Sequence, residues 1–361
     1  STINNKDLKY GVDLIVGVNS QGVFATPKGN TDGVDLKPYK IVENGAFVYN
    51  PTRLELGSIA YRTEELCIVS HLYMVFYLTD EGKKIIDPTW LYIYFRRSEF
   101  CREVKFRNFG SQRPEFNFND MSDIVIPLPD IEIQKKYVDI YNTMLENQKS
   151  YEYGLEDLKL ACDAYIEDLK HSIHCKAIGP YVERYDVRNR TNEIKNVMGV
   201  STSKEFREPT SKVNRNELSN YKIVRPHQIS FVQTTHNEKV FAYAFNNTED
   251  DIVVTSVNEV FSVDEDKLLP EYLCMFFNRT EFDRYARFHS WGSARETFTW
   301  DDLVKVEIPI ADMKTQKSIA DIYKAYKEQK AINEKLKAQI KDICPILIKG
   351  SIEEARKAKE A

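Results

Sequence analysis

The stretch from Ile131 to Lys170 constrains the fold of this 361-residue chain more than any other. It contains no proline, and a mostly apolar seam recurs along it at alternating spacings of four and three residues. That spacing is the heptad pattern of a helix packed along another helix, and at 1.5 Å per residue ~40 residues form a rod of roughly 60 Å. The sequence therefore predicts a long spacer helix, with an ordinary core helix as the alternative. The seam consists of Tyr137, Tyr141, Met144, Gln148, Tyr151, Leu155, Leu158, Cys162, Tyr165 and Leu169.

A second stretch of the same character begins near Ile308 and is the expected partner of the first. Its opening, IPIADMKTQKS at 308–318, repeats IPLPDIEIQKK at 126–136 with a shift of 182 residues. Pro345 is expected to limit or kink this second helix, because proline cannot donate a backbone hydrogen bond. The stripe of the second helix consists of Ile322, Gln329, Ile332, Leu336, Ile340 and Ile343.

The same shift recurs upstream of both stretches. YKIV stands at 39–42 and again at 221–224, and FGSQR at 109–113 matches WGSAR at 291–295. A repeat this long indicates two copies of a domain rather than a solenoid. The order along the chain is therefore globular unit, long helix, globular unit, long helix.

Each globular unit has the sequence pattern of mixed α and β structure, without regular strand–helix alternation. Residues 66–78 are rich in β-branched and aromatic types and predict buried strand, while Asp87 and Pro88 predict a helix start. The expected fold class is α+β: two tandem mixed α/β domains separated by two long antiparallel coiled-coil helices, with pseudo-two-fold internal repetition. The expected boundaries are 1–130 for the first domain, 131–173 for the first spacer helix, 174–312 for the second domain, 313–349 for the second spacer helix and 350–361 for a charged tail.

Composition limits the classes of function. The formal net charge is −5, from 50 Lys and Arg against 55 Asp and Glu, which argues mildly against a nucleic-acid ligand for the surface as a whole. No apolar run is long enough to cross a bilayer and no signal peptide is visible, so we expect no membrane partner. The six cysteines form no CxxC pair, which predicts reduced thiols and a cytoplasmic location.

Positive charge is nevertheless concentrated at equivalent places of the repeat. From Ile93 to Arg113 six Lys and Arg residues accompany two acids, a local charge of +4, and from Asn278 to Arg295 four accompany two, a local charge of +2. Aromatic residues are interleaved, and each stretch ends in Gly-Ser-x-Arg. Such a surface suits a phosphate backbone, and solvated helix faces are the alternative interpretation.

Motifs of catalysis are absent from the sequence. It contains no GxGxxG, Walker A or GxSxG motif and no Asn-Pro-Pro-aromatic tetrad, so we expect no catalytic residue and no bound cofactor. His171, His174 and Cys175 form HxxHC, but a metal site would need a further ligand from elsewhere. A polar helix end is the simpler interpretation, and we expect no metal.

Two mixed domains, each followed by a helix that opens I-P-[LI]-x-[DE]-x-x-x-Q-K, resemble the specificity (S) subunit of a Type I restriction–modification enzyme. The resemblance covers nearly the whole chain and includes FVYNPTRLELGSIA at 47–60 and IGPYVERYDVRNRTNEIKNVMGVSTSKEF at 178–206. These two stretches resemble the early strands and the opening of the target recognition domains of that family. The first unit departs from the pattern, because it lacks the DVRNR-like stretch, so the start of the first domain is not fixed by the sequence.

The resemblance implies a DNA-reading protein that is not itself an enzyme. Each target recognition domain would read one half of a split, asymmetric sequence in double-stranded DNA, and the helices would set the distance between the halves. Two methyltransferase (modification) subunits would dock on this subunit, and restriction (translocase) subunits would join them. S-adenosylmethionine and ATP would belong to those partners, and the bases read are not given by the sequence.

The candidate DNA-binding residues lie on loops and on basic helices. Glycine lets a backbone approach DNA closely, and the fork of an arginine matches guanine or phosphate. Gln134 and Gln316, at matching points of the two helix openings, mark the expected partner-docking surface, or else they cap their helices. The DNA candidates are Gly110, Ser111 and Arg113 with Gly292, Ser293 and Arg295, then Asn50, Arg53, Thr234, Thr235 and His236, together with Arg102 and Arg284.

Two other classes of function compete with DNA recognition. One is a coiled-coil scaffold whose globular ends bind proteins and not DNA. The other is an enzyme with an unrecognised active site, which would methylate or cleave DNA by itself. Salt dependence separates the first from a DNA reader, because binding through phosphates weakens steeply with salt.

Overall fold

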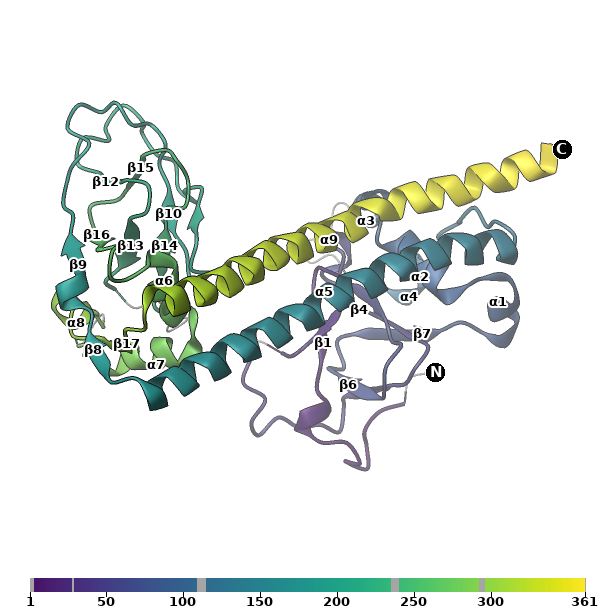
Figure 1. Cartoon of the computed structure of the whole chain (residues 1–361). Coiled ribbons are helices and arrows are strands. Elements are labelled where there is room, and N and C mark those ends of the chain that lie inside the picture. The colour runs from purple at the N-terminus through teal and green to yellow at the C-terminus, as the bar shows by residue number, and fades with distance from the viewer. Residues whose placement is uncertain (1–2, 28, 109–114, 235–239, 292–295, 361) are drawn as a thin grey trace. The chain divides into compact units, whose positions relative to one another are not determined.

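The computed structural model describes residues 3–27, 29–108, 115–234, 240–291 and 296–360. The chain forms two compact units: unit 1 contains residues 1–151 and 332–361, and unit 2 contains residues 152–331 (Figure 1). Two long helices, α5 (Ile131–Ser172) and α9 (Met313–Glu360), contribute to both units. The expected α+β class with two long helices is therefore confirmed.

The internal repeat is visible in the order of the elements. Four helices of unit 1 and their counterparts begin 182 residues apart, which confirms the tandem duplication inferred from the sequence. The pairs are α2 (Pro88–Phe95) with α6 (Pro270–Asn278), α3 (Ser98–Arg107) with α7 (Thr280–Phe288), α4 (Phe118–Ser122) with α8 (Trp300–Leu303), and α5 with α9. The side chain of Asp87 accepts hydrogen bonds from the amides of Thr89 and Trp90, so the expected cap of α2 is also confirmed.

Unit 1 is built on a three-stranded antiparallel sheet of order β5-β4-β7, formed by β5 (Ile59–Tyr61), β4 (Ala46–Tyr49) and β7 (Met74–Tyr77). Two smaller pairs accompany it: β3 (Lys40–Val42) with β6 (Cys67–Val69), and β1 (Gly17–Val18) with β2 (Phe24–Ala25). The remaining elements are η1 (Val12–Leu14), η2 (Leu54–Leu56) and α1 (Asp80–Ile85). The stretch 66–78, expected as buried strand, is divided by a turn closed from Tyr73 N to Ser70 O at 3.0 Å, and β7 is only partly buried.

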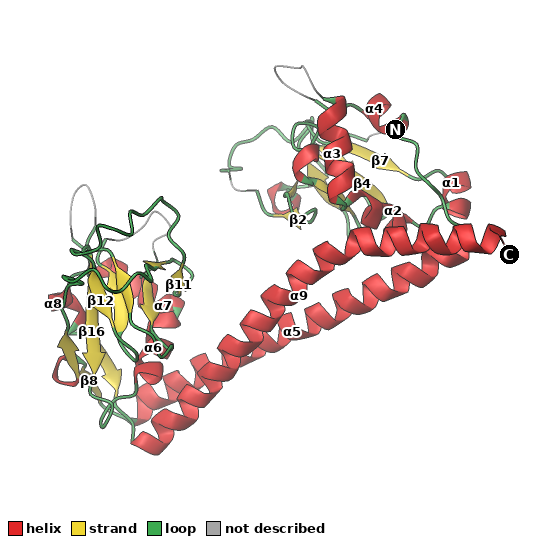
Figure 2. Ribbon diagram, turned by 90° about the horizontal axis from the view of Figure 1, so that it is seen from above, coloured by secondary structure: helices red, strands yellow, loops and turns green. Residues whose placement is uncertain are grey.

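Unit 2 has a four-stranded sheet of order β14-β13-β16-β9, formed by β14 (Tyr243–Phe245), β13 (Ile229–Val232), β16 (Asn258–Val263) and β9 (Val182–Arg184), which are labelled in Figure 1. Figure 2 labels β16, one of its two inner strands. Strand β9 pairs with β16 and forms one edge of the sheet. The described part of unit 1 has no counterpart of β8 or β9. The other pairs are β12 (Lys222–Val224) with β15 (Ile252–Val254), β10 (Gly199–Val200) with β11 (Phe206–Arg207), and β17 (Glu307–Pro309) with β8 (Cys175–Ala177); η3 spans Gly179–Tyr181.

The two long helices run antiparallel within each unit. In unit 1, Lys136 pairs with Glu354 at 2.8 Å, and twelve residues further along α5 Gln148 meets Asn333. In unit 2, a Cβ added to Gly154 would lie 3.3 Å from Oε1 of Gln329. Gly154 therefore sits at a close approach of the helices, where a larger side chain would press on its neighbour.

Each half of the helix pair is part of the core of its unit. In unit 1, Val138 and Tyr141 of α5 join Cys344 and Leu347 of α9 in the same cluster as Trp90. In unit 2, Ile166 and Leu169 join Ile319 and Tyr323 in a cluster with the aromatic side chains of β13, β14 and α6. Burial of this apolar surface, at roughly 25 cal/mol per Å², stabilises the helices more than their intrinsic propensity does.

The seam differs from the strict heptad pattern at two places. Tyr165 was expected inside but is 45% exposed, and Ile166 is fully buried in its place. Ile332 is likewise 42% exposed, while Asn333 is buried. An α-helix has 3.6 residues per turn, so the buried face drifts relative to a strict seven-residue repeat unless the helix supercoils.

The second helix is also longer than expected. It continues through Pro345 to Glu360, so residues 350–360 are helical and not a separate tail. Cys344 and Leu347, on either side of the proline, are both buried, as is Ser351 one turn further on. This packing holds the helix together across the one hydrogen bond that proline cannot make.

Three observations bear on the excluded classes of function. All six cysteines lie in the described part of the chain and are free. Among the described residues no group of three or more His, Cys, Asp or Glu side chains is arranged to hold a metal ion. This applies also to His171, His174 and Cys175. No described helix is long and apolar enough to span a bilayer.

Candidate nucleic-acid interface

The two Gly-Ser-x-Arg loops lie outside the described residues. This applies to Gly110, Ser111, Arg113, Gly292, Ser293 and Arg295, and also to Thr235 and His236. The described candidates are Asn50, Arg53, Thr234, Arg102 and Arg284.

Asn50 shapes the loop between β4 and β5. Its Oδ1 accepts hydrogen bonds from Thr52 N at 3.0 Å and from Thr52 Oγ1 at 2.8 Å, which is a local turn typical of asparagine. Arg53, one residue further on, is exposed. The asparagine therefore positions this loop, and the arginine is the side chain of the two that is free to reach a ligand.

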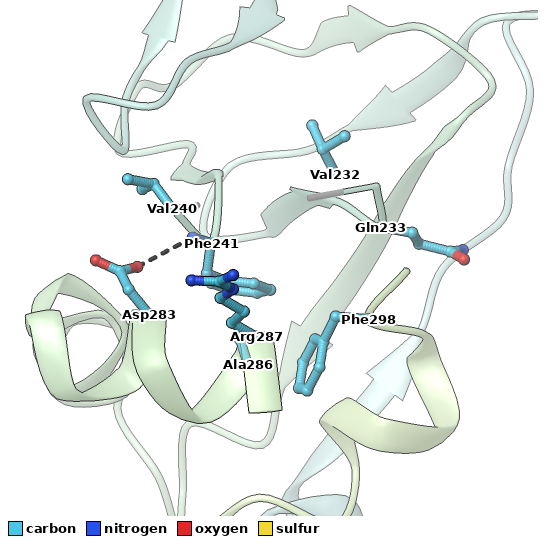
Figure 3. Close-up of a pocket in the computed structure, with 8 residues that line it drawn as sticks. All are labelled: Val232, Gln233, Val240, Phe241, Asp283, Ala286, Arg287 and Phe298. Atoms are coloured by element: carbon cyan, nitrogen blue, oxygen red, sulfur yellow. Dashed lines mark hydrogen bonds between the residues drawn. The ribbon is translucent and has the colours of Figure 1, made fainter. Parts of the chain in front are cut away.

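Thr234 lies at the start of the corresponding loop of unit 2. It forms a β-bridge with Thr297, and the amide of Phe298 donates to the carbonyl of Gln233 at 2.8 Å. On the return side, the amide of Phe241 donates to Oδ1 of Asp283 in α7 at 3.0 Å (Figure 3). Both ends of the stretch from Thr234 to Phe241 are therefore anchored to neighbouring elements.

Asp283 also forms an ion pair with Lys204. Its Oδ1 lies 2.8 Å from Nζ of Lys204, which is almost completely buried and also donates to the carbonyl of Phe277 at 2.7 Å. Burial lowers the pKa of the Lys204 amine, and the contact with Asp283 opposes that shift. Figure 3 shows Asp283, Phe241 and Arg287 around one small recess beside α7.

Several arginines of the basic stretches serve the fold and are not available to a ligand. Arg96 is buried and donates to the carbonyl of Gly57 at 2.7 Å, and the guanidinium of Arg97 lies 3.8 Å from the ring centre of Tyr94. Arg279 is largely enclosed by three carboxylates, those of Asp163, Glu167 and Glu281. The local charges counted from the sequence therefore overstate the cationic surface.

Arg102 and Arg284 are an equivalent pair of exposed arginines in the repeat. They occupy the same position of α3 and α7, 182 residues apart. Arg102 is 3.5 Å from Glu99, a marginal contact, and Arg284 has no ion-pair partner among the described residues. Both guanidinium groups can therefore reach an external acceptor.

Gln134 and Gln316 are fully buried, and each makes the same three hydrogen bonds. Gln134 Nε2 donates to the carbonyls of Ile85 and Pro129, and its Oε1 accepts from Asp87 N at 2.9 Å. Gln316 repeats this arrangement with Lys267, Ala311 and Leu269. Of the two roles considered for these glutamines, securing the start of each long helix is the one that their contacts serve, and no amide atom of either side chain faces outward.

A cluster of charges in unit 2 was missed in the sequence. Glu259 lies in β16 with its side chain almost completely buried, and it accepts two hydrogen bonds from Arg184, from Nε at 2.9 Å and from Nη2 at 2.7 Å. Nζ of Lys222 lies 3.4 Å from the same carboxylate, and Gln233 also donates to it. Hydrogen bonding to Glu259 raises the pKa of the Arg184 guanidinium. A glutamate inside the apolar strand NEVFSV is the signal that could have revealed the cluster, because a buried carboxylate requires partners.

Comparisons with known proteins agree with this architecture. The profile of the Type I restriction modification DNA specificity domain matches residues 2–152 and again residues 189–342. The chain belongs to the family of Type I restriction–modification DNA specificity domains. Members of this family are the DNA-recognition component of their systems and are not catalytic. No curated protein matches the chain.

A solved structure of a specificity subunit shares the fold of this chain. The S subunit of a Type I restriction–modification system from M. genitalium is 12% identical, with a TM-score of 0.53 over 92% of this chain and 87% of that one. The HsdS subunit from Thermoanaerobacter tengcongensis is 13% identical, with a TM-score of 0.37 over 97% and 93%. A structure of a type I R-M system, solved to describe its complex assembly and conformational transition, is 15% identical with a TM-score of 0.47 over 95% and 89%.

Proposed function

We propose that this specificity-domain protein is the DNA sequence-recognition subunit of a Type I restriction–modification complex, in which each globular unit reads one half of a bipartite, asymmetric target. The observation that carries the proposal is that the family profile matches twice, once over most of each unit. Two similar but non-identical modules on one chain are suited to two different short sequences at a fixed spacing.

In this proposal, α5 and α9 set the distance between the two halves of the target. This part of the proposal is supported by the cores of the units, since side chains of both α5 and α9 belong to the core of each unit. The exposed faces of the same helices are proposed to carry two methyltransferase subunits, to which restriction subunits add. Because Gln134 and Gln316 are enclosed, their influence on docking would be through the position of the helix starts.

DNA contact is proposed to come from the loops of each unit together with the exposed arginines beside them. Arg113 and Arg295, with their Gly-Ser neighbours, would contact bases or phosphates, and Arg102 and Arg284 would contact the backbone. Arg53, and Thr234 with Thr235 and His236, would add contacts from the second loop of each unit. The contacts of Phe241 with Asp283 and of Thr234 with Thr297 support this, because they anchor the described residues on either side of the second loop of unit 2.

The Arg184–Glu259 pair is proposed to read bases in the half bound by unit 2. Glu259 binds the Nε and Nη2 edge of the Arg184 guanidinium and so fixes its orientation. The Arg184 side chain is half exposed, so its remaining N–H groups can reach a ligand. Lys222 has its counterpart in Lys40 of unit 1, whose Nζ instead donates to the carbonyl of Tyr73 at 2.6 Å. The described part of unit 1 has no such cluster, and this difference suits a task in which the two units must differ.

The decisive experiment is selection of DNA from a randomised duplex library, followed by mapping of methylated adenines in host DNA with and without the gene. We expect one split motif in both, and the methylation of that motif should disappear with the gene. Binding should weaken steeply as salt rises, because phosphate contacts release counterions. Selection that yields no motif, or binding that salt leaves unchanged, would favour a protein-binding scaffold instead.

A further inference from the structure

Two phenylalanines stand out on the surface of the repeat. Phe106 in α3 and Phe288 in α7 occupy equivalent positions, 182 residues apart, and each is 82% exposed. Each follows an exposed arginine by four residues, Arg102 in the first unit and Arg284 in the second, so the two side chains share one face of the helix. An exposed arginine with an exposed phenylalanine is therefore presented twice.

The fold does not explain this repetition. Phe100 and Phe282, also equivalent and also identical, are buried in the cores of their units, so their identity follows from packing. Phe106 and Phe288 contribute no comparable packing, because most of each ring is in water. Exposing a large aromatic side chain twice at the same site points to a ligand that both units share.

The surrounding charge indicates what that ligand is. Residues 102–108 hold three Lys and Arg and one acid, and residues 284–290 hold two Arg and no acid, so each window carries +2 in a chain of net charge −5. The acid of the first window, Glu103, is paired with Arg107 at 2.9 Å, and in the second window Arg287 lies 3.9 Å from Glu296, which stands outside that window. A cationic surface around an aromatic ring complements a polyanion with stacked bases better than it complements an ordinary protein surface.

We propose that Phe106 and Phe288 contact the base stack of double-stranded DNA, one in each half of the target, and act as wedges at a base step while Arg102 and Arg284 hold the adjacent phosphates. This rests on the proposed function and adds a contact to it that distorts the duplex. Base-reading residues should differ between the two units, whereas a wedge can be the same in both because it reads deformability and not a hydrogen-bond pattern. The identity of the pair in both units fits the second role.

The test uses the 361-residue chain and a duplex selected from a random library by the unchanged protein. The variants are Phe106→Ala and Phe288→Ala, with Phe106→Trp and Phe288→Trp as conservative replacements. Leu72→Ala and Val257→Ala are the matched controls, because both side chains are about two-thirds exposed, at 66% and 69%, and lie in equivalent turns. Affinity, fluorescence transfer between the ends of the duplex and permanganate reactivity of unstacked thymines are measured, and thermal melting checks the fold.

Each alanine variant should bind about 10-fold more weakly, in line with the removal of one base–aromatic interaction. In each alanine variant the permanganate reactivity of thymines should fall in one half of the target only, and the bend of the duplex should decrease. The tryptophan variants should keep the reactivity and the bend of the unchanged chain. The controls should match the unchanged chain. Unchanged affinity and unchanged permanganate reactivity in both alanine variants would overturn the proposal of a wedge. Normal DNA binding combined with the loss of a subunit that co-purifies with the unchanged chain would also overturn it. That result would assign the site to a protein partner. If the unchanged chain selects no duplex, the proposed function itself fails.

Discussion

Gln148 donates a 2.9 Å hydrogen bond from Nε2 to Oδ1 of Asn333, joining α5 to α9 inside unit 1. Both side chains are almost completely buried, in a contact between helices that is otherwise mostly apolar. A polar pair at such a place satisfies its groups only when the helices are in one register. The pair therefore selects one alignment of α5 against α9.

The first prediction concerns this pair. Asn333→Leu should lower the free energy of unfolding by about 1–3 kcal/mol, because the substitution removes the acceptor of a buried amide. The double variant Gln148→Leu with Asn333→Leu should recover much of the loss, since neither side chain of the pair is then left without the other. Urea unfolding of the single and double variants measures the coupling. Additive losses would show that the two side chains act independently.

The second prediction concerns the buried glutamines. Gln134→Ala should weaken the contact of α5 with residues 85–87, and Gln316→Ala that of α9 with residues 267–269, each by about 1–3 kcal/mol. Hydrogen exchange should quicken at Asp87 in the first variant and at Leu269 in the second. Gln339→Ala, at an exposed position of α9, is the control and should change neither. Exchange that stays the same in both variants would separate the glutamines from the helix starts.

The third prediction concerns alkaline pH. Burial raises the pKa of Tyr243 well above its usual value, and the nearby phenol of Tyr323 raises it further. The folded state therefore retains a proton that the unfolded state releases above pH ~10. The stability from this group is complete below that pH and is lost as pH rises beyond it.

Tyr243→Phe should make the decline in stability between pH 9 and pH 11 shallower, although it removes the 2.7 Å hydrogen bond to the carbonyl of Cys274. Comparing the variant with the unchanged chain cancels other groups, including Lys204, whose lowered pKa acts with the opposite sign. Urea midpoints across the range, with phenolate absorbance as a second signal, measure the effect. Parallel curves would contradict it.

Most of what the sequence could predict about the fold came from the internal repeat. One shift of 182 residues relates the starts of four helices of unit 1 to those of their counterparts, because equivalent sequence folds into equivalent elements. The errors arose where tertiary packing decides which side chains are buried and where a helix ends. Asn333 is buried in place of Ile332 because helix geometry drifts from the heptad, and α9 passes Pro345 because side chains on both sides are buried.

The candidate site was less predictable than the fold. Composition identified basic stretches, but only contacts separate Arg279, which is enclosed by carboxylates, from Arg284, which has no ion-pair partner in the described part of the chain. Arg184 and Glu259 are 75 residues apart in the chain, so no local pattern could pair them. Their proximity is a product of the pairing of β9 with β16.

The fourth prediction concerns the arginines of the Gly-Ser-x-Arg loops. Arg113→Ala should relax selectivity in one half of the target and Arg295→Ala in the other, because each loop belongs to a different unit. The cost should be about 1–3 kcal/mol for a base contact, and a phosphate contact would instead weaken all sequences alike. Libraries randomised in one half at a time measure both effects. Unchanged affinity and preference in both halves would remove these arginines from the DNA surface.

The last prediction concerns Arg184 and its support. Arg184→Lys keeps the charge but loses the planar fork, so selectivity should relax in the half read by unit 2 while that of the other half is retained. Glu259→Gln should act in the same direction and more weakly, because it loosens the orientation of Arg184 without removing it.

Arg188→Lys is the matched control, since Arg188 is also held by an acid, Asp186 at 3.3 Å, and donates to the carbonyl of Asn220. Binding to a library randomised in the second half separates the outcomes, with thermal melting to verify the fold. If Arg184 reads a base, its replacement should change the preference at one position of the target by about 1–3 kcal/mol, whereas a structural ion pair would lower the melting temperature and leave the base preference intact. The second result would confine the Arg184–Glu259 pair to the stability of unit 2.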